Sequence, residues 1–223
     1  MPVFRVLNSR SKNLLIYMWG GYNFYLIKSF GNKITLKVWQ QEFIKNMPQE
    51  VQDRALHKLV MINNTGKLED LRLPPGNHLE KLYGDRIGQY SIRIQKQYWI
   101  CFNYSNGEFL QCWNSWLSLG GKIKMAKNLA SPKMSSFLWD DFMKPLHISA
   151  YKLAKEINVP VSRIQDILHD RRKITADTSI RLGRYFGISD DYFFKIQNEL
   201  DLRNVLMKNK SDFDAIRRVT VKQ

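Results

Sequence analysis

The chain is 223 residues long, and its 44% of hydrophobic and 25% of charged residues exclude a wholly disordered protein, while its 2 Cys exclude a disulfide scaffold. It carries a formal net charge of +15, with 17 basic and 8 acidic side chains in residues 1–125 and 18 basic and 12 acidic side chains in residues 126–223. The length suits two domains of about 100 residues each, and the basic surplus of both halves favours a polyanionic partner, either nucleic acid or an anionic membrane.

Residues 1–25 are interpreted as an extension that precedes the first domain. An apolar run over residues 14–27 follows Arg5, Arg10 and Lys12, and glycines at 20 and 21 interrupt it. The run has 14 residues, fewer than the ~20 that a membrane-spanning helix needs. No small-residue cleavage site follows it, so it does not match a signal peptide. We therefore expect a cytoplasmic protein with no membrane partner.

Two helices are predicted next. Apolar residues at helical spacing run from Leu36 to Ile44 and predict a first helix over that range. A second helix follows Pro48 and ends at Asn64-Thr65-Gly66. Its apolar stripe consists of Val51, Ala55, Leu59 and Ile62, and the polar residues expected outside that stripe are Gln52, Asp53, Lys58 and Asn63. Residues 71–77 are expected to be an irregular loop, because two prolines and a glycine are adjacent there.

After this loop, apolar residues recur at every second position, as in a strand. Tyr90, Ile92 and Ile94 alternate with polar residues, and further strands are expected over residues 98–104 and 109–113. Asn106-Gly107 between the last two runs predicts a tight hairpin, since both turn residues need positive φ. Together with the helical pair, these strands predict an α+β domain with a small antiparallel sheet.

The predicted hairpin also sets a register for the two cysteines. With Asn106-Gly107 as the turn, Cys101 lies opposite Cys112. This would be a hydrogen-bonded pair, whose geometry suits a disulfide poorly. We therefore expect two free thiols in a reducing compartment.

Residues 114–135 have the composition of a linker, and every element after them is predicted to be a helix. The expected helices cover residues 137–143, 150–158, 161–169, 176–186 and a segment after Ser189, with Ser149, Thr175 and Ser189 as N-caps and Gly187 as a C-terminal cap. This pattern predicts a compact all-α domain. Residues 207–223 are expected to be a loose basic tail.

The spacing of the second and third helices in this domain predicts a helix-turn-helix. Ala154 is small where the helices over residues 150–158 and 161–169 would cross. Ile164 and Leu168 would hold the later of these two helices against the earlier one. The usual turn glycine is replaced by Asn158, and Asn also tolerates a left-handed backbone. A plain helix pair would explain the apolar residues, but not the small residue, the Val-Pro turn and the outward polar set together.

The outward face carries side chains that can read bases or bind phosphates. The residues expected to contact DNA are Ser149, Tyr151, Lys152, Val161, Ser162, Arg163, Gln165, Asp166, Arg171, Arg172 and Lys173. Arg can bind guanine in a bidentate manner and Gln can bind adenine, so the helix over residues 161–169 is expected to enter the major groove.

Residues 146–155, 159–164, 174–187 and 196–203 resemble the HigA antitoxins of the Xre-like helix-turn-helix class. The resemblance covers about residues 130–204 and implies a helix-turn-helix domain over 136–206. It also implies an autorepressor that forms a homodimer, binds palindromic operator DNA and neutralises a partner toxin through direct contact. A two-fold symmetric dimer would space its recognition helices by one DNA turn, ~34 Å.

Residues 27–104 resemble the HigB toxins, which are RelE-like, ribosome-dependent mRNA endonucleases. The matching segments are Ile27–Phe30, Leu73–Leu79, Gly84–Arg86, Gly88–Ile94 and Tyr98–Phe102. The resemblance implies a RelE-like toxin domain over residues 26–113, with mRNA and the ribosome as partners. Because Met125 resembles an antitoxin start, the chain is similar to two adjacent genes read as one.

The chain departs from the toxin pattern at residues that carry the chemistry. The family has Lys where this chain has Tyr83 and Arg where it has Trp99, and the closing Asp-Tyr-His of the last strand is absent. The remaining candidates for catalysis are His78, Arg86 and Arg93, with Arg72, Lys81 and Lys96 as further cations. Each has a plain alternative, in which Arg86 caps the sheet or pairs with Asp85, Arg93 lies on the polar face of its strand, and His78 is simply solvated. No cofactor and no metal are expected.

Three hypotheses follow. In the first, a toxin–antitoxin fusion binds operator DNA while its endonuclease is impaired. In the second, a live endonuclease is caged by the antitoxin in the same chain, since a short linker gives roughly millimolar effective concentration. In the third, the chain is a basic DNA-coating protein without sequence preference, which predicts steep salt dependence but no specificity.

Overall fold

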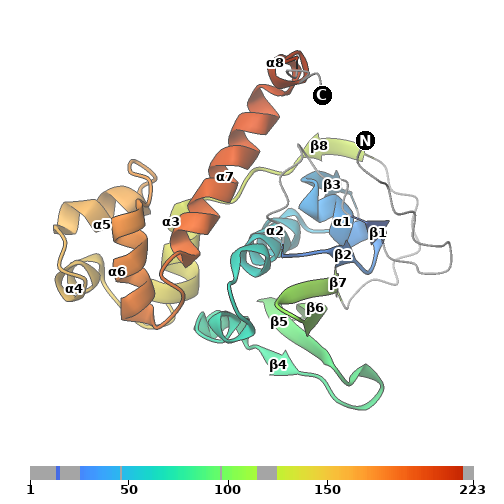
Figure 1. Ribbon diagram of the computed structural model, residues 1–223, viewed down its shortest axis with the longest axis horizontal. Helices are drawn as coiled ribbons and strands as arrows, with labels where there is room; N and C mark the ends of the chain where they lie inside the picture. Colours follow the sequence, from blue (N-terminus) through green and yellow to red (C-terminus); the bar gives the residue numbers. More distant parts are fainter. Residues whose placement is uncertain (1–13, 16–25, 46, 96, 115–124, 218–223) are drawn as a thin grey trace, which may run out of the picture.

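The structure is a computed structural model of the 223-residue chain that describes residues 14–15, 26–45, 47–95, 97–114 and 125–217. Most of the predicted 1–25 extension, Lys96, and parts of the predicted linker and tail lie outside these ranges. Figure 1 shows a sheet-containing unit and a helical unit, with α2 (Gln49–Asn64) and α7 (Tyr192–Lys208) packed side by side between them. No helix within the described ranges is long and apolar enough to cross a membrane.

The first helix, α1, is shorter than predicted. It spans Lys33–Trp39 and begins at Asn32, whose side-chain oxygen accepts a first-turn amide hydrogen bond at 2.8 Å. Gln41 has a φ of 62°, a left-handed conformation that does not continue a helix. Residues Glu42–Ile44 form strand β3, which pairs antiparallel with β8 (Met125–Asn128). The prediction of a helix through residue 44 is wrong, because pairing with a strand distant in sequence overrides the local pattern.

The main sheet has six described strands in the order β1-β2-β7-β6-β5-β4. Its central strands are the three that the sequence predicts: β5 (Gln89–Gln95), β6 (Tyr98–Ser105) and β7 (Glu108–Asn114). The sequence did not reveal the short strands β1 (Leu14–Leu15), β2 (Ser29–Phe30) and β4 (Glu80–Lys81). The α+β prediction for this domain is confirmed, and the sheet is mixed at one end because β2 runs parallel to β7.

The β6–β7 hairpin has the predicted turn but not the predicted cysteine pairing. Asn106 and Gly107 have φ values of 51° and 79°, as a tight hairpin turn requires. Pairing follows the predicted register next to the turn and then shifts at an irregularity between Cys101 and Asn103, so that Cys101 pairs with Trp113. The expected Cys101–Cys112 pairing is therefore wrong, because a bulge adds one residue to one strand. Both cysteines are buried free thiols, and burial raises the pKa of Cys112.

Helix α2 is buried on two sides. One side packs on β5 and β6, and the other contacts α7. Gln52, Lys58 and Asn63, which were predicted to lie outside the apolar stripe, are nevertheless buried, and Asp53 is half-buried. Lys58 and Asn63 are buried against Asp141 and Glu199 of the helical unit, whereas Gln52 donates to the backbone of Ile44 and Met47 in its own unit. The buried apolar side chains of both units form one continuous core.

The double-proline loop contains short turns of 3-10 helix. These are η1 (Leu68–Leu71) and η2 (Pro75–Asn77), so the expectation of a wholly irregular loop is wrong. The loop ends at His78, whose φ of 44° lies in the left-handed region. A third such turn, η3 (Gly84–Arg86), lies between β4 and β5.

The second unit is helical, as predicted. Its remaining elements are α3 (Met134–Ser136), the π-helix η4 (Phe137–Met143), α4 (Ala150–Glu156), α5 (Val161–Leu168), α6 (Ala176–Phe186) and α8 (Lys210–Asp214). Phe142 lies at its centre, with ring centroids of Phe186 and Phe193 at 4.8 and 5.1 Å. The predicted caps at Ser149 and Thr175 are confirmed by their hydrogen bonds to first-turn amides.

Three details of this unit differ from prediction. Asp191 occupies the N-cap position of α7. The Ser189 hydroxyl, which was expected to cap this helix, instead donates to Asp70 of the sheet-containing unit at 2.5 Å. Residues 125–128 of the predicted linker form β8. The predicted loose tail begins inside α7 and continues as α8, so its described part is largely helical.

Candidate nucleic-acid interfaces and the junction between the domains

The turn between α4 and α5 has the geometry that the sequence predicts. Ser149 caps α4, and Asn158 takes the left-handed conformation with a φ of 55°. The Val159 amide donates to the Ala154 carbonyl oxygen at 2.9 Å, which closes the turn. Ile164 is fully buried and holds α5 against the domain. These contacts fix the orientation of the outward face of α5.

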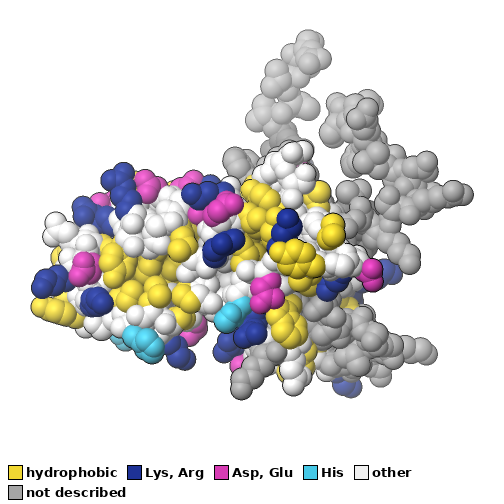
Figure 2. Space-filling model, turned by 90° about the horizontal axis from the view of Figure 1, so that it is seen from below, with side chains coloured by type: hydrophobic (Ala, Val, Ile, Leu, Met, Phe, Trp, Pro, Cys, Tyr) yellow, Lys and Arg dark blue, Asp and Glu magenta, His cyan; other side chains and the backbone are white. Residues whose placement is uncertain are grey.

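Most of the predicted DNA contacts are exposed. The exposed ones are Ser149, Tyr151, Lys152, Ser162, Gln165, Arg171, Arg172 and Lys173, whereas Val161, Arg163 and Asp166 are partly buried. Tyr151 on α4 is 66% exposed. Figure 2 shows Lys and Arg side chains spread over the visible face, with Asp and Glu among them, so the basic surplus is interleaved with acidic groups.

Ion pairs hold several of these side chains. Arg163 Nη1 donates to Asp177 at 2.8 Å, and Asp177 also accepts from Arg181 Nε at 2.9 Å. The hydrogen bond from Arg181, and after it that from Arg163, lowers the pKa of Asp177. Asp166 pairs with Arg171 at 3.0 Å. Because Asp177 lies on α6, the helix that follows α5, it orients Arg163 from outside α5.

Lys173 has a separate partner in α7. Its Nζ lies 3.0 Å from an Asp201 carboxylate oxygen, and its side chain is 71% exposed. An exposed pair of this kind contributes little to stability, so it leaves Lys173 able to exchange partners.

The three candidate catalytic residues lie on or next to the β4–β5 hairpin. His78 is exposed just before β4. Arg86 donates from Nε to the Gln89 side-chain oxygen at 2.9 Å. This Nε is therefore bonded to Gln89 and not to Asp85, the partner that the sequence suggested. Arg93 is half-buried on β5, and its Nε has no hydrogen-bond partner among the described residues.

Trp99 is the cross-strand neighbour of Arg93, so the departure from the toxin pattern lies directly beside a candidate cation. Tyr83, the other departure, is 77% exposed in the turn of the hairpin. Among the described residues, no three His, Cys, Asp or Glu side chains gather where they could hold a metal ion.

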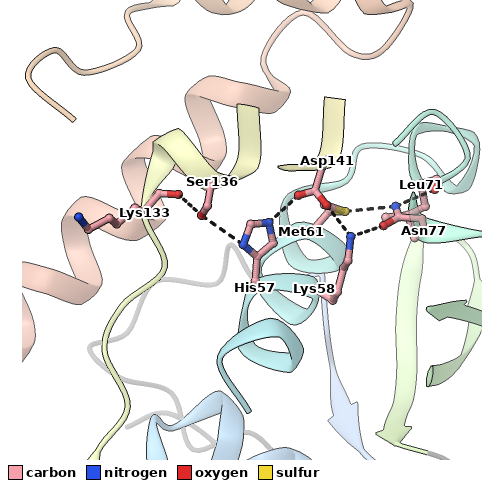
Figure 3. A network of polar contacts seen from close by, with 8 residues as sticks. All are labelled: His57, Lys58, Met61, Leu71, Asn77, Lys133, Ser136 and Asp141. Carbon is pink, nitrogen blue, oxygen red and sulfur yellow. Dashed lines mark hydrogen bonds and ion pairs between the residues drawn. The ribbon is translucent and has the colours of Figure 1, made fainter. Parts of the chain in front are cut away.

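Sequence reasoning missed the polar junction between the two domains. Asp141 of η4 is buried between two residues of α2: its Oδ1 accepts from Lys58 Nζ at 2.6 Å and its Oδ2 lies 2.5 Å from His57 Nε2 (Figure 3). The His57 ring also stacks on Phe137 of η4, with centroids 3.6 Å apart. The pKa of Asp141 would be raised by burial, but the charges and hydrogen bonds of Lys58 and His57 outweigh that effect and lower it to about 2.

A second polar contact lies at the other end of α2. Glu199 of α7 accepts from the side-chain amides of Asn63 at 2.8 Å and Asn64 at 2.5 Å. Arg203 bridges back to Glu199 and lies over the Trp39 ring, 3.9 Å from its centroid. The run Leu59-Val60-Met61-Ile62 was the missed signal, because four consecutive apolar residues cannot share one helix face and indicate burial on both sides.

Comparison with known proteins assigns both parts of the chain. Residues 28–115 match the family model described as RelE-like toxin of type II toxin-antitoxin system HigB, and residues 141–193 match a helix-turn-helix model. Toxin HigB-1 of Vibrio cholerae is 32% identical over 75 residues, which cover 31% of this chain and 79% of that protein.

Two further relatives are similar to part of the chain. Virulence-associated protein I of Dichelobacter nodosus is 42% identical over 66 residues, which cover 30% of this chain and 61% of that protein. The solved structure of Pseudomonas aeruginosa antitoxin HigA with higBA promoter is 29% identical, with a TM-score of 0.39, and the match covers 41% of this chain and 100% of that one. The chain thus belongs, through residues 28–115, to the HigB-like family of RelE-like toxins, and it joins this toxin domain to a helix-turn-helix domain.

Proposed function

We propose that the chain is a cytoplasmic, sequence-specific DNA-binding autorepressor whose helix-turn-helix half holds a toxin half with an impaired mRNA endonuclease. One observation carries the proposal. Helix α2 of the toxin domain is buried against η4 and α7, whereas Gln165 on α5 and Tyr151 on α4 are exposed. Toxin packing and DNA contact therefore use different faces of the helix-turn-helix domain and are compatible in one chain.

In this proposal α5 enters the major groove of operator DNA. Gln165 and Ser162 project from its exposed face and can hydrogen-bond to base edges. Arg171 and Arg172 follow in an exposed turn, where guanidinium groups can bind phosphate oxygens. The phosphate contacts would fix the register, and the contacts from α5 would supply sequence preference.

A homodimer is part of the same proposal. Exposed apolar side chains lie on α7 and just after α8 and form a C-terminal ridge, with Leu202 64%, Val205 44% and Ile216 68% exposed. Such a ridge supports association with a second copy through this unit. Two-fold symmetry would place the two α5 helices on half-sites ~34 Å apart.

Repression of a reporter gene tests this function. The DNA upstream of the chain's own coding sequence would drive the reporter, and the full chain is expected to lower its output. Gln165→Ala is expected to relieve repression, because it removes a base-reading amide. Glu156→Ala at the exposed end of α4 provides the control and should leave repression intact. Equal repression by the wild type and the Gln165 variant would count against α5 as the reading helix.

Arg163 is expected to read one operator base pair. Arg163→Ala should cost ~1–3 kcal/mol of binding at that base pair and relax specificity there. Asp177→Asn, which keeps a hydrogen-bond acceptor but removes the charge that orients the guanidinium, should have a smaller effect of the same sign. Fluorescence anisotropy on operators with single base-pair changes measures both. A uniform loss on every sequence would instead indicate that Arg163 contacts phosphate.

The endonuclease is proposed to be impaired for a chemical reason. Cleavage of mRNA on the ribosome develops negative charge on a phosphodiester, which cationic donors stabilise. Trp99 stands where the toxin pattern has Arg, and it offers one N–H in place of a guanidinium. The neighbouring Arg93, with Arg86 and His78, remains to contact RNA.

The alternative function is a live endonuclease caged by the fused helix-turn-helix half. The junction around Asp141 favours it, since Asp141 pairs with both His57 and Lys58 across the two domains and all three side chains are largely buried. Mutation of Trp99 separates the two possibilities.

A further inference from the structure

A series of buried polar contacts connects the helix-turn-helix half to the double-proline loop of the toxin half (Figure 3). Asp141 accepts from Lys58 Nζ at 2.6 Å, and the same Nζ donates to Asn77 Oδ1 at 2.7 Å. Asn77 Nδ2 then donates to the Leu71 carbonyl oxygen at 2.8 Å. Each side chain in this series is buried, so each depends on its neighbour for hydrogen bonding.

Asn77 closes the loop that ends at His78. Its side chain is fully buried, its amide group bonds to Leu71 at the start of the loop, and its backbone amide donates to Pro74 at 2.9 Å. His78 follows at once in a left-handed conformation. A change in the orientation of Asn77 therefore changes the backbone that presents His78.

Lys58 holds Asn77 only while its own charge is compensated. Its side chain is 8% exposed, and its described partners are the Asp141 carboxylate and the Asn77 amide oxygen. A buried ammonium group without a counter-charge is unstable and would turn toward solvent. Without Asp141, Lys58 would leave Asn77 Oδ1 without its donor.

We infer that the helix-turn-helix half sets the conformation of the loop at residues 71–78 through Asp141, Lys58 and Asn77. Lys58 and Asn77 are then positioning residues for the candidate RNA-contact site at His78, and Asp141 is the antitoxin-side group that controls them. The role at His78 rests on the proposed function of the toxin half. The coupling itself concerns only backbone and side-chain contacts.

Hydrogen exchange of the full chain, resolved by peptide, tests the coupling. Asp141→Asn keeps the size of the side chain and removes its charge, and it is expected to speed amide exchange in residues 71–79 about tenfold or more. Glu199→Gln is the matched control, because it weakens the same interface at Asn63 and Asn64, away from the loop. It should speed exchange at the end of α2 and in α7 but leave residues 71–79 unchanged.

Lys58→Met with Asp141→Asn keeps the experiment informative if the single variant does not fold, since no buried ion is then left uncompensated. This double variant should also speed exchange in the loop. Equal loop exchange in the Asp141, double and Glu199 variants would overturn the inference. Because the readout uses neither DNA nor RNA, failure of repression or of RNA binding would be a separate result that leaves the coupling intact.

Discussion

Asp141→Ala is expected to lower the free energy of unfolding by about 3–5 kcal/mol. The substitution leaves Lys58 buried and without its counter-charge, and it removes the partner of His57 Nε2. Urea denaturation of the full chain measures the loss. Asp140→Ala is the control, because Asp140 is the adjacent carboxylate and is exposed. A difference of less than ~1 kcal/mol between the two variants would contradict the role given to Asp141.

The pairing of Asp141 with Lys58 and His57 predicts that stability depends on pH. Asp141 has a folded-state pKa of about 2 against an ordinary value of 3.8. Its stabilising contribution, about 2 kcal/mol, is therefore complete above pH 3.8 and is lost as the pH falls through 2. Asp141→Asn should remove this part of the acid sensitivity. An unchanged slope of stability against pH between 4 and 2 would contradict the ionised, paired state of Asp141.

Trp99→Arg is expected to raise ribosome-dependent mRNA cleavage by the full chain by ~10²–10³-fold, because it restores a cationic donor beside Arg93. Cleavage of a defined mRNA in a reconstituted translation reaction measures the rate. Trp139→Arg adds the same charge in the helix-turn-helix half, where the side chain is 43% exposed, and should leave the rate unchanged.

The outcomes of this substitution separate the two functions. A rise confined to Trp99→Arg supports an impaired but repairable site. High cleavage by the wild-type chain would mean that Tyr83 and Trp99 are tolerated and that the enzyme is live. No rise in the cleavage rate of either variant would show that Trp99 is not the main cause of the impaired cleavage.

Local signals in the sequence predicted the elements that depend on local physics. Asn106-Gly107 fixed the hairpin because both residues tolerate positive φ, and Ser149, Thr175 and Gly187 marked helix ends through side-chain and backbone capping. The left-handed backbone at Asn158 was likewise predictable from its residue type. These features need no knowledge of a distant partner.

The features that could not be predicted depend on segments far apart in the chain. The burial of Lys58 and Asn63 could not be predicted, because their partners, Asp141 and Glu199, lie in the other domain. The bulge that displaces Cys101 leaves no mark in the hydrophobic alternation. For the candidate RNA site, the sequence identified the residue types, but the placement of Trp99 opposite Arg93 came only from strand pairing.

Selection of bound duplexes from a random DNA library by the full chain, at about 0.15 M salt, tests the central claim most directly. The account predicts one enriched palindromic motif with half-site centres about 10 base pairs apart, bound at least ~10³-fold more tightly than random DNA. Tight binding without any enriched motif would contradict it, because the chain would then be a basic protein that coats DNA through phosphate contacts alone.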